Sequence, residues 1–517
     1  MIPKTAPMTP VTLGAARLRI EGLIGVARHG APLSLASDPD FRARIEACAA
    51  FLTRLLAEGV EVYGVNTGYG DSCTVSIPPD LVAELPVHLS RYHGCGLGRI
   101  LDEVETRAVL VARLTSVAQG HSAVRWELLE AIAVLLNKNI LPRIPSEGSV
   151  GASGDLTPLS YLVATLIGER EVSYQGQVRE ASAVLAEQGI TPLTLAPKEA
   201  LALMNGTAVM TDLACLAFDR AAYLGRLASR LTALAGAGLH SNRDHFHPRL
   251  FELKPHAGQQ AVAGRIYEDL GAIPGPDPWR LQDRYSIRCA PHVIGVLEDA
   301  LPWIRRDLEH ELNSANDNPL FDAEAGLLLH GGHFYGGHVA FAMDALKTAV
   351  ANVADLLDRQ LALLVDNRYN HGLPQNLSGA AGPRAAINHG LKAAQILASA
   401  LTAEALKQCM PASVFSRSTE CHNQDKVSMG TIASRDCLRV LELTERVAAI
   451  LCVATRQALA LRTRAGDSGR DRLAEEAHAF LRDLEELIPF IEEDRPLDTL
   501  LNQLSLEIQN QRWKLYE

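Results

Sequence analysis

A run of small residues in the first third of the chain could perform chemistry on its own backbone. Within Gly148–Leu159, the tripeptide Ala152-Ser153-Gly154 lies between glycines and just before an expected helix start. If the amide nitrogen of Gly154 reaches the carbonyl carbon of Ala152, the backbone can close into a five-membered ring, because glycine has no Cβ to crowd the approach. Loss of water from the ring and from Ser153 would then leave a conjugated alkene, which is a strong electrophile.

Two simpler interpretations compete with this one. The run could form only a flexible turn and a helix cap, and local composition alone leaves that alternative open. A hydrolase nucleophile elbow, Gly-x-Ser-x-Gly, is nearly matched at Gly151-Ala152-Ser153. The elbow is disfavoured because Asp155 stands where the last glycine belongs and no parallel-sheet pattern surrounds it.

The run resembles the signature of the aromatic amino acid ammonia-lyases, the histidine, phenylalanine and tyrosine lyases. Further matches follow in the family's order along nearly the whole chain. They are Val62–Gly70, Leu203–Thr207, Gln282–Pro291, Asn313–Pro319, His330–Gly332 and Asn423–Gly430. The resemblance implies that Ala152-Ser153-Gly154 becomes 4-methylidene-imidazol-5-one autocatalytically, that this group supports elimination of ammonia from an aromatic amino acid, and that no metal is needed.

The resemblance also implies roles for residues outside the tripeptide. Tyr63 would be the base at the substrate's β-carbon, and its phenol would need a pKa lowered by positive charge, amide donors or a helix N-terminus. Arg288 would bind the substrate carboxylate through its planar fork of donors. An ordinary half-buried tyrosine and a structural ion pair are the simpler alternatives for these two. The other family positions would contact the electrophile or the substrate: Asn205, Gln282, Tyr285, Phe334, Asn423 and Gln424.

Three histidines, His330, His333 and His338, could together bind a metal. No carboxylate lies at ligand spacing and the neighbouring glycines favour a loop, so we expect no metal site. The family usually has Asn where this chain has His333, which leaves the role of that position open.

Two adjacent residues largely decide the substrate in the family, and here they align as Tyr92-His93. Histidine lyases typically have Ser-His, tyrosine lyases His-Leu and phenylalanine lyases Phe-Leu, so this pair matches none of them. His93 agrees with the histidine pattern but could equally hydrogen-bond a phenol hydroxyl. Gln424 stands where histidine lyases carry Glu and the other two carry Gln. We therefore expect L-tyrosine as substrate and trans-4-hydroxycinnamate as product.

Other functions stay open at this point. A histidine ammonia-lyase would form urocanate, and an aromatic 2,3-aminomutase would return ammonia to the β-carbon. The sequence also leaves open whether the electrophile attacks the amine or the aromatic ring. A catalytically silent tetrameric scaffold belongs to a different class, and the intact tripeptide, Tyr63 and Arg288 argue against it.

Long helices are expected to position these residues. In 339–364 apolar residues recur at three- and four-residue steps without Gly or Pro, as in a helical bundle. We expect an all-α fold, an elongated bundle of long antiparallel helices with an N-terminal region of catalytic loops. Further helices are predicted at 41–59, 105–119, 125–138, 158–168, 198–238 (interrupted at Asn205-Gly206), 384–409 (with Gly390 as a breaker) and 431–465, with a small strand pair within 170–195. The expected parts are residues 1–200 with the catalytic loops, 201–465 with the bundle, and 466–517 as a helical cap.

Composition bounds the partners and the compartment. The 517 residues are 47% apolar and carry 49 basic against 60 acidic side chains, a net charge of −11 with no long basic run, so nucleic acid is not expected. The nine cysteines lack a CxxC pair and no signal pattern opens the chain, which favours a reducing cytoplasm. The long helices are too charged for a membrane. The family resemblance adds a small amino acid substrate and a homotetramer whose subunits share active sites.

Overall fold

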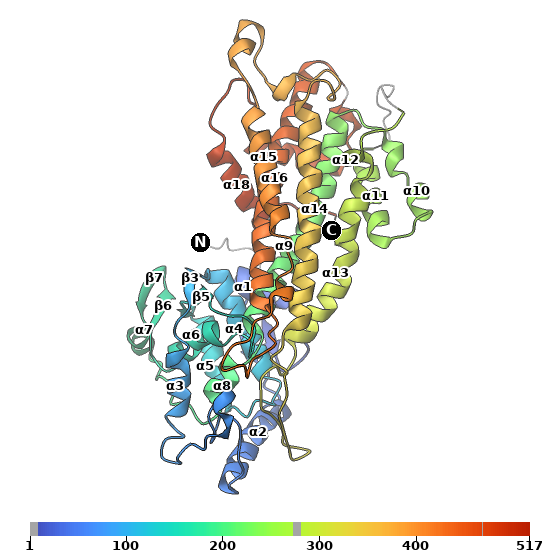
Figure 1. Ribbon diagram of the computed structural model, residues 1–517. Coiled ribbons are helices and arrows are strands. Elements are labelled where there is room, and N and C mark those ends of the chain that lie inside the picture. Colours follow the sequence, from blue (N-terminus) through green and yellow to red (C-terminus); the bar gives the residue numbers. More distant parts are fainter. Residues whose placement is uncertain (1–8, 272–280, 468, 517) are drawn as a thin grey trace. The chain divides into compact units, whose positions relative to one another are not determined.

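The computed structural model describes residues 9–271, 281–467 and 469–516. These residues are mostly helical with few, short strands, so the all-α class predicted from the sequence is confirmed (Figure 1). They divide into two compact units. Unit 1 comprises Met1–Leu216, Arg305–Asp344 and Pro411–Arg435, and unit 2 comprises Ala217–Ile304, Ala345–Met410 and Asp436–Glu517.

Unit 1 is built mainly from short helices, whose starts follow familiar capping chemistry. Asp38 accepts a hydrogen bond from the Asp40 N–H at the start of α2 (Pro39–Ala57). Asp102 and Glu105 form a capping box at the start of α4 (Glu103–Val117). The helices are α1 (Ile20–His29), α2 (Pro39–Ala57), η1 (Gly70–Thr74), α3 (Leu85–Tyr92), α4 (Glu103–Val117), α5 (Trp126–Asn137), α6 (Leu156–Leu166), α7 (Ala181–Glu187), α8 (Glu199–Met204) and η5 (Ala412–Phe415).

The strands of unit 1 form small separate sheets. They are β1 (Val11–Leu13) parallel to β2 (Leu33–Leu35), β3 (Leu97–Ile100) with β5 (Pro145–Glu147), β4 (Leu141–Pro142) with β6 (Glu171–Tyr174) and β7 (Gln177–Glu180), and β8 (Leu320–Asp322) with β9 (Leu327–Leu329). The strand pair predicted within 170–195 is confirmed as β6 and β7. Its turn has positive φ at Gln175 and Gly176, +51° and +75°, as a two-residue hairpin requires.

Unit 2 contains the remaining helices, and four long helices contribute residues to both units. The four are α9 (Ala208–Gly238), α13 (Ala290–Leu312), α14 (Gly337–Val365) and α16 (Gly430–Arg464). The others are η2 (Arg243–Phe246), α10 (Pro248–Glu252), α11 (Ala257–Asp269), α12 (Tyr285–Arg288), η3 (Gln375–Leu377), η4 (Gly382–Ile387), α15 (Lys392–Lys407), η6 (Arg470–Arg472), α17 (Glu475–Leu487) and α18 (Asp498–Gln509). Among the described residues, no helix is both long and apolar enough to cross a membrane.

The long helices largely follow the predicted ranges. The predictions for 339–364 and 431–465 are confirmed by α14 and α16, and the predicted break in 198–238 separates α8 from α9. The stretch 384–409 is interrupted at Gly390 as predicted, since the 3-10 helix η4 lies before this residue and α15 begins after it at Lys392. Gly390 there has a φ of +51°, and an added Cβ would lie 2.5 Å from the carbonyl oxygen of Asn376, so the chain turns before the helix starts.

Within unit 2, α9, α14 and α16 lie side by side (Figure 1). An added Cβ at Gly238 of α9 would lie 3.4 Å from Leu364 of α14 and 3.5 Å from Ala458 of α16. Gln360 of α14 also donates to Thr232 Oγ1 of α9 at 2.9 Å. Small residues therefore let these helices approach closely.

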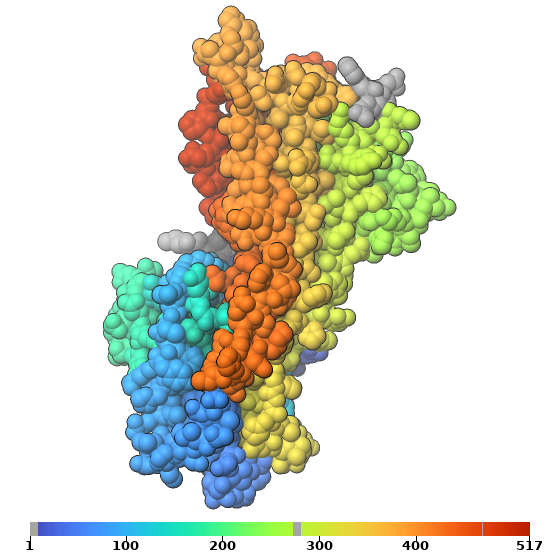
Figure 2. All heavy atoms as spheres, viewed as in Figure 1, coloured from blue at the N-terminus to red at the C-terminus, as the bar shows by residue number. Residues whose placement is uncertain are grey.

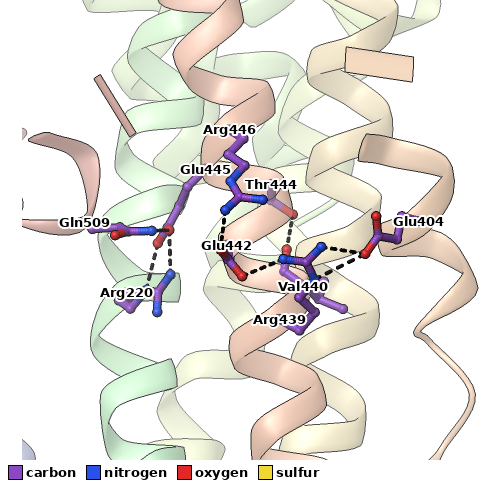
Figure 3. Close-up of polar contacts among 9 residues, drawn as sticks. All are labelled: Arg220, Glu404, Arg439, Val440, Glu442, Thr444, Glu445, Arg446 and Gln509. Carbon is purple, nitrogen blue, oxygen red and sulfur yellow. Dashed lines mark hydrogen bonds and ion pairs between the residues drawn. The ribbon is translucent and has the colours of Figure 1, made fainter. Parts of the chain in front are cut away.

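Two ion pairs and a hydrogen bond connect α16 to three other helices of unit 2 (Figure 3). Glu445 of α16 pairs with Arg220 of α9 at 2.6 Å and accepts from Gln509 of α18 at 3.1 Å. Arg439 of α16 pairs with Glu404 of α15 at 2.6 Å. Glu445 is buried, so its carboxylate needs the partners that α9 and α18 supply. This network therefore favours the observed neighbours of α16.

Unit 1 contains a fully buried ion pair. Lys198, directly before α8, lies with its Nζ 2.5 Å from Oδ2 of Asp317, and both side chains are wholly inaccessible to solvent. Asp317 also accepts from Ser122 Oγ at 3.1 Å. Each charge compensates the other in a place that water does not reach.

Removing the Asp317 charge should therefore destabilise the protein. Asp317→Asn leaves the Lys198 ammonium buried without an anion, and breaking such a pair typically costs about 3–5 kcal/mol. We expect a loss of that size in the free energy of unfolding, measured by urea denaturation.

The double variant Lys198→Met/Asp317→Leu removes both charges and should be closer to wild type than the single variant. Glu46→Gln, which breaks the exposed Arg42–Glu46 pair of α2, is the control and should change little. A double variant no more stable than Asp317→Asn would contradict the interpretation.

Candidate active site

A cavity of about 400 Å³ in unit 1 opens beside Ser153. Its walls come from η1 and the loop before it, the second half of α3, the start of α6, α8 with Asn205 directly after it, and the segment 411–429. Figure 2 shows this segment (orange) against the blue N-terminal part of the same unit. The lining residues are Tyr63, Tyr69, Gly70, Ser72, Leu89, Tyr92, His93, Ser153, Leu156, Leu201, Asn205, Glu420 and Gln424. We call this cavity the tripeptide pocket.

The tripeptide ends at a position that only glycine can occupy. Gly154 has a φ of +69°, in the left-handed region. An added Cβ there would lie 2.0 Å from the carbonyl oxygen of Gly206, because the two backbones run side by side. The same oxygen accepts from the backbone N–H of Asp155 at 2.8 Å. Any side chain at position 154 would therefore clash with the backbone of residue 206.

Two donors converge on the carbonyl oxygen of Ser153. Nδ2 of Asn205 lies 3.1 Å from it and the backbone nitrogen of Gly206 lies 3.3 Å from it. The Oγ of Ser153 accepts from Nε2 of Gln424 at 3.1 Å. Among the described residues, the buried Oδ1 of Asn205 has no hydrogen-bond partner. The structure thus brings together the tripeptide, Asn205 and Gln424, with one acceptor left over.

The other side of the tripeptide loop pairs with a segment almost 280 residues away in sequence. The backbone N–H of Ser428 donates to Gly151 at 3.2 Å, and that of Met429 donates to Val150 at 3.0 Å. The hydroxyl of Ser428 also donates to the carbonyl of Gly151 at 3.2 Å. The loop is therefore held between residues 205–206 on one side and 428–429 on the other.

Asp155 joins the tripeptide to the helix that follows it. Its carboxylate accepts from Ser149 Oγ at 2.8 Å, from the Met210 N–H at 2.9 Å and from Thr431 Oγ1. Burial raises the pKa of Asp155, and these donors act in the opposite direction. Since α6 begins at Leu156, the positive end of its dipole lies next to the tripeptide.

Tyr63 has one of the partners expected for a base, but its pKa is shifted the other way. Its phenol oxygen accepts from the backbone N–H of Gly70 at 2.7 Å. Burial nevertheless raises the pKa of Tyr63, and the nearby Glu420 carboxylate raises it further. The prediction of a lowered pKa is therefore wrong in this structure, because a single amide donor does not offset desolvation and no cation is present among the described lining residues.

Glu420 is a lining residue that the sequence analysis did not select. Both of its carboxylate oxygens lie 3.0 Å from the backbone N–H of Asp71. An added Cβ at Gly70 would lie 2.3 Å from Glu420 Oε2, so the carboxylate packs on the residue that donates to Tyr63. The only signal in the sequence was an acidic residue four positions before Gln424.

Tyr92 and His93, at the end of α3, both line the tripeptide pocket. Nδ1 of His93 lies 3.0 Å from the carbonyl oxygen of Leu89, so this nitrogen carries the proton and Nε2 is left as an acceptor. Burial lowers the pKa of His93, which keeps the ring neutral near pH 7. The two rings lie 4.3 Å apart. A neutral imidazole of this kind can accept a hydrogen bond from a hydroxyl or N–H group of a ligand.

Three predicted site residues, Gln282, Tyr285 and Arg288, belong to unit 2, whereas the described residues that line the tripeptide pocket belong to unit 1. Tyr285 and Arg288 lie on α12, where the Arg288 guanidinium is 4.7 Å from the Tyr285 ring. Nε of Arg288 donates to the carbonyl of Asp283 at 2.9 Å. These residues are thus not among those that the tripeptide pocket brings together within one chain.

Two further predicted residues, Phe334 and Asn423, belong to unit 1 but are not lining residues of the tripeptide pocket. Phe334 is half-buried in the loop between β9 and α14, and Asn423 is exposed, with its backbone N–H donating to the carbonyl of Glu420 at 2.9 Å. The histidines within 330–338 are exposed. Nowhere in the described ranges do three or more His, Cys, Asp or Glu side chains form a group that could hold a metal ion.

Comparison with known proteins finds similarity along almost the whole chain. Residues 18–485 match the family model described as aromatic amino acid lyase. The tyrosine ammonia-lyase of Cereibacter sphaeroides is 38% identical over 506 residues, 94% of this chain and 95% of that protein. The histidine ammonia-lyase of Sorangium cellulosum is 37% identical over 496 residues, 93% of each. The crystal structure of tyrosine aminomutase from Streptomyces globisporus matches with a TM-score of 0.90 at 33% identity, over 98% of this chain and 97% of that one.

The chain therefore belongs to the aromatic amino acid lyase family, as the sequence motifs indicated, and it is an enzyme of the carbon–nitrogen lyase class. The names of these relatives give two substrates, histidine and tyrosine, and two outcomes, elimination and migration of the amino group. Membership of the family does not choose among them, so the choice depends on the tripeptide pocket.

The influence of Glu420 on Tyr63 can be tested through the pH dependence of turnover. Glu420→Gln keeps an oxygen that can accept from Asp71 but removes the negative charge, so the pKa of Tyr63 should fall toward its ordinary value. If Tyr63 is the base that the family resemblance implies, its phenolate is the active form, and the rising limb of kcat/KM should move to lower pH. Profiles of the wild type and the variant measure this shift.

Glu324→Gln is the matched control, since Glu324 is an exposed acid of the same unit outside the tripeptide pocket. Its profile should coincide with that of the wild type. A profile of Glu420→Gln that does not move, in a variant that still turns over, would contradict the role given to the carboxylate.

Proposed function

We propose that the protein eliminates ammonia from L-tyrosine and forms trans-4-hydroxycinnamate. The observation that carries this proposal is the neutral His93 in the wall of the tripeptide pocket, with Nε2 free to accept a hydrogen bond from a phenol hydroxyl. Gln424 supports the same choice, because an amide at that position offers no charge to an imidazole substrate. A relative at 38% identity that is named tyrosine ammonia-lyase agrees with it.

The electrophile of the proposal is 4-methylidene-imidazol-5-one, formed from Ala152, Ser153 and Gly154 without a metal. This group supplies an alkene that accepts electrons and makes the amino group or the ring of the substrate more reactive. Its ring nitrogen would come from Gly154, where no Cβ fits. Its carbonyl would come from Ser153, whose oxygen already accepts from Asn205 and Gly206. These two donors would withdraw electron density from the conjugated alkene.

The chain's own residues divide the remaining tasks. Tyr63 takes the proton from the β-carbon, and the Gly70 N–H stabilises the phenolate that this step requires. The unpartnered Oδ1 of Asn205 accepts from the amino group and holds it beside Ser153. The proton ends on the Tyr63 phenol and the amine leaves as ammonia. Arg288 binds the substrate carboxylate in this proposal.

The family resemblance adds to this proposal a homotetramer whose subunits share active sites. Arg288, Gln282 and Tyr285 lie outside the set of lining residues in their own chain, and Tyr285 is 71% exposed. A second subunit could therefore supply them. Exposed large apolar side chains of unit 2 are compatible with such an assembly. They include Val296, Ile387, Ile396, Leu397, Leu406 and Met410.

A histidine ammonia-lyase is the second candidate, and one observation favours it. The Glu420 carboxylate lines the tripeptide pocket and could pair with an imidazole, which partly replaces the Glu that Gln424 lacks. An aromatic 2,3-aminomutase is the third, because a structure at 33% identity is named tyrosine aminomutase.

The nine cysteines are all free, which supports a reducing compartment such as the cytoplasm.

Turnover of three amino acids separates the candidates. We expect purified protein to convert L-tyrosine to a product with the ultraviolet absorbance of a hydroxycinnamate, and to convert L-phenylalanine and L-histidine more slowly. Growth of the urocanate band alone would overturn the tyrosine assignment, and a β-amino acid as main product would identify an aminomutase.

Ser153→Ala is the control for the electrophile. This variant should lose turnover while keeping its helical content, and its mass should lack the loss of two water molecules expected for the wild-type chain. Substantial remaining activity in Ser153→Ala would rule the electrophile out.

His93 can be tested by removing its acceptor. His93→Phe keeps an aromatic ring but cannot accept from a phenol, so kcat/KM for tyrosine should fall about tenfold, as expected for one lost hydrogen bond. The value for phenylalanine should change less. His88→Phe, an exposed histidine on the same helix, is the control. Equal losses with both substrates would contradict the contact with a hydroxyl.

A further inference from the structure

We propose that unit 2 contains a second binding site, for a free α-amino acid, in a cavity of about 640 Å³ formed by α17, the C-terminal segment 512–516 and Arg230 of α9. We call it the C-terminal cavity. All of its lining residues belong to unit 2, so it is separate from the tripeptide pocket, and it does not depend on which reaction the enzyme performs.

Two buried donors without partners line the C-terminal cavity. Arg230 is 2% exposed and Trp513 is 4% exposed. Within the residues that the structure describes, neither Nη1 of Arg230 nor Nε1 of Trp513 has a hydrogen-bond partner. Both atoms can only donate, so the missing partner must be an acceptor. A carboxylate offers two acceptor oxygens and matches this pair.

The existing contacts of Arg230 leave this donor available. Its Nε lies 3.2 Å from Asp269, its Nη2 lies 3.9 Å from Glu476, and its guanidinium lies 4.6 Å from the ring of Tyr516. Burial raises the pKa of Asp269 to about 7, so this partner is only partly ionised near neutral pH. Asp269 and Glu476 thus contact Nε and Nη2 of Arg230 and leave its Nη1 without an acceptor among the described residues.

The C-terminal cavity also contains acidic side chains, which would repel a ligand that carries only negative charge. Its acidic lining residues are Glu476 and Asp483 of α17, and its other basic lining residues are Arg512 and Lys514. A ligand with a carboxylate for the donors and an ammonium for the acids satisfies both sets. An α-amino acid carries these two groups on one carbon atom.

The remaining wall suits an aromatic side chain. The rings of Phe480 and Trp513 lie 5.3 Å apart at 77°, and Tyr516 and Ala479 also line the cavity. Aromatic surfaces of this kind favour an aromatic or large apolar group. The structure thus points to an amino acid of the aromatic class.

The same combination of features marks the tripeptide pocket. There, too, a buried polar atom without a partner, Oδ1 of Asn205, belongs to a lining residue of a cavity whose wall contains aromatic, apolar and acidic side chains. In both places a folded chain leaves a polar group unsatisfied where a ligand can reach it.

Calorimetric titration with L-phenylalanine tests the proposal. The full-length Ser153→Ala protein, which should not turn the ligand over, is titrated with and without Trp513→Phe. Trp513→Phe keeps the aromatic wall and removes only the indole N–H, so it should weaken one class of site by about tenfold or more. Trp303→Phe, outside the lining, is the control and should leave the titration unchanged. Thermal unfolding of each variant verifies that the fold is retained.

The number of sites distinguishes this proposal from the proposed reaction. If both are right, the titration shows two sites per chain and Trp513→Phe weakens one of them. If the tripeptide pocket does not bind the ligand, the titration shows a single site and Trp513→Phe weakens it. A titration that Trp513→Phe does not alter overturns the proposal.

Two analogues test the need for both charges. 3-Phenylpropionate lacks the ammonium and phenethylamine lacks the carboxylate, and each should bind to the C-terminal cavity more weakly than L-phenylalanine. Equal binding of 3-phenylpropionate would assign the cavity to simple carboxylates instead. Asp483→Asn should weaken L-phenylalanine and leave 3-phenylpropionate unaffected or tighter.

Discussion

The close approach of two backbone segments, at Gly154 and Gly206, is the constraint on which the candidate active site depends. An added Cβ at Gly154 would lie 2.0 Å from the Gly206 oxygen, and one at Gly206 would lie 2.0 Å from the guanidinium of Arg113. Two glycines are therefore stacked against a buried arginine, with no room for a side chain at either level. This packing aims the Gly206 and Asn205 donors at Ser153 and lets α6 start directly after the tripeptide.

The packing behind these glycines is strongly charged. Arg113 is fully buried and donates to Asn316 at 2.9 Å and to the carbonyl of Ala202. Burial lowers the pKa of Arg113 to about 10, which still leaves it charged at neutral pH. Lys198 and Asp317 form a second buried set. Arg113, directly against Gly206, therefore places a positive charge in a low-dielectric interior, where it acts over a longer distance than in water, whereas the charge of Lys198 is compensated by Asp317.

Local patterns in the sequence predict the long helices and the tripeptide well, because these depend on neighbouring residues. The apolar repeat in 339–364 and the Asn205-Gly206 break are examples. The break at Gly390 is also visible in the sequence, but the close approach of this residue to the carbonyl oxygen of Asn376 is not. Glu420 was missed because its role arises from a contact with Asp71, 349 positions earlier. The raised pKa of Tyr63 depends on burial and on the charge of the same Glu420 carboxylate. The division into parts at residues 200 and 465 stays a prediction.

The pairing of residues 150–151 with 428–429 has a consequence for how the enzyme matures. About five-sixths of the chain must leave the ribosome before residues 428–429 are available for this pairing. Contacts between residues so far apart in sequence form late, because closing large loops is slow. A nascent or truncated chain ending before Ser428 holds the tripeptide on one side only. If the tripeptide cyclises as proposed, we therefore expect the reaction only after residues 428–429 have folded against the tripeptide loop.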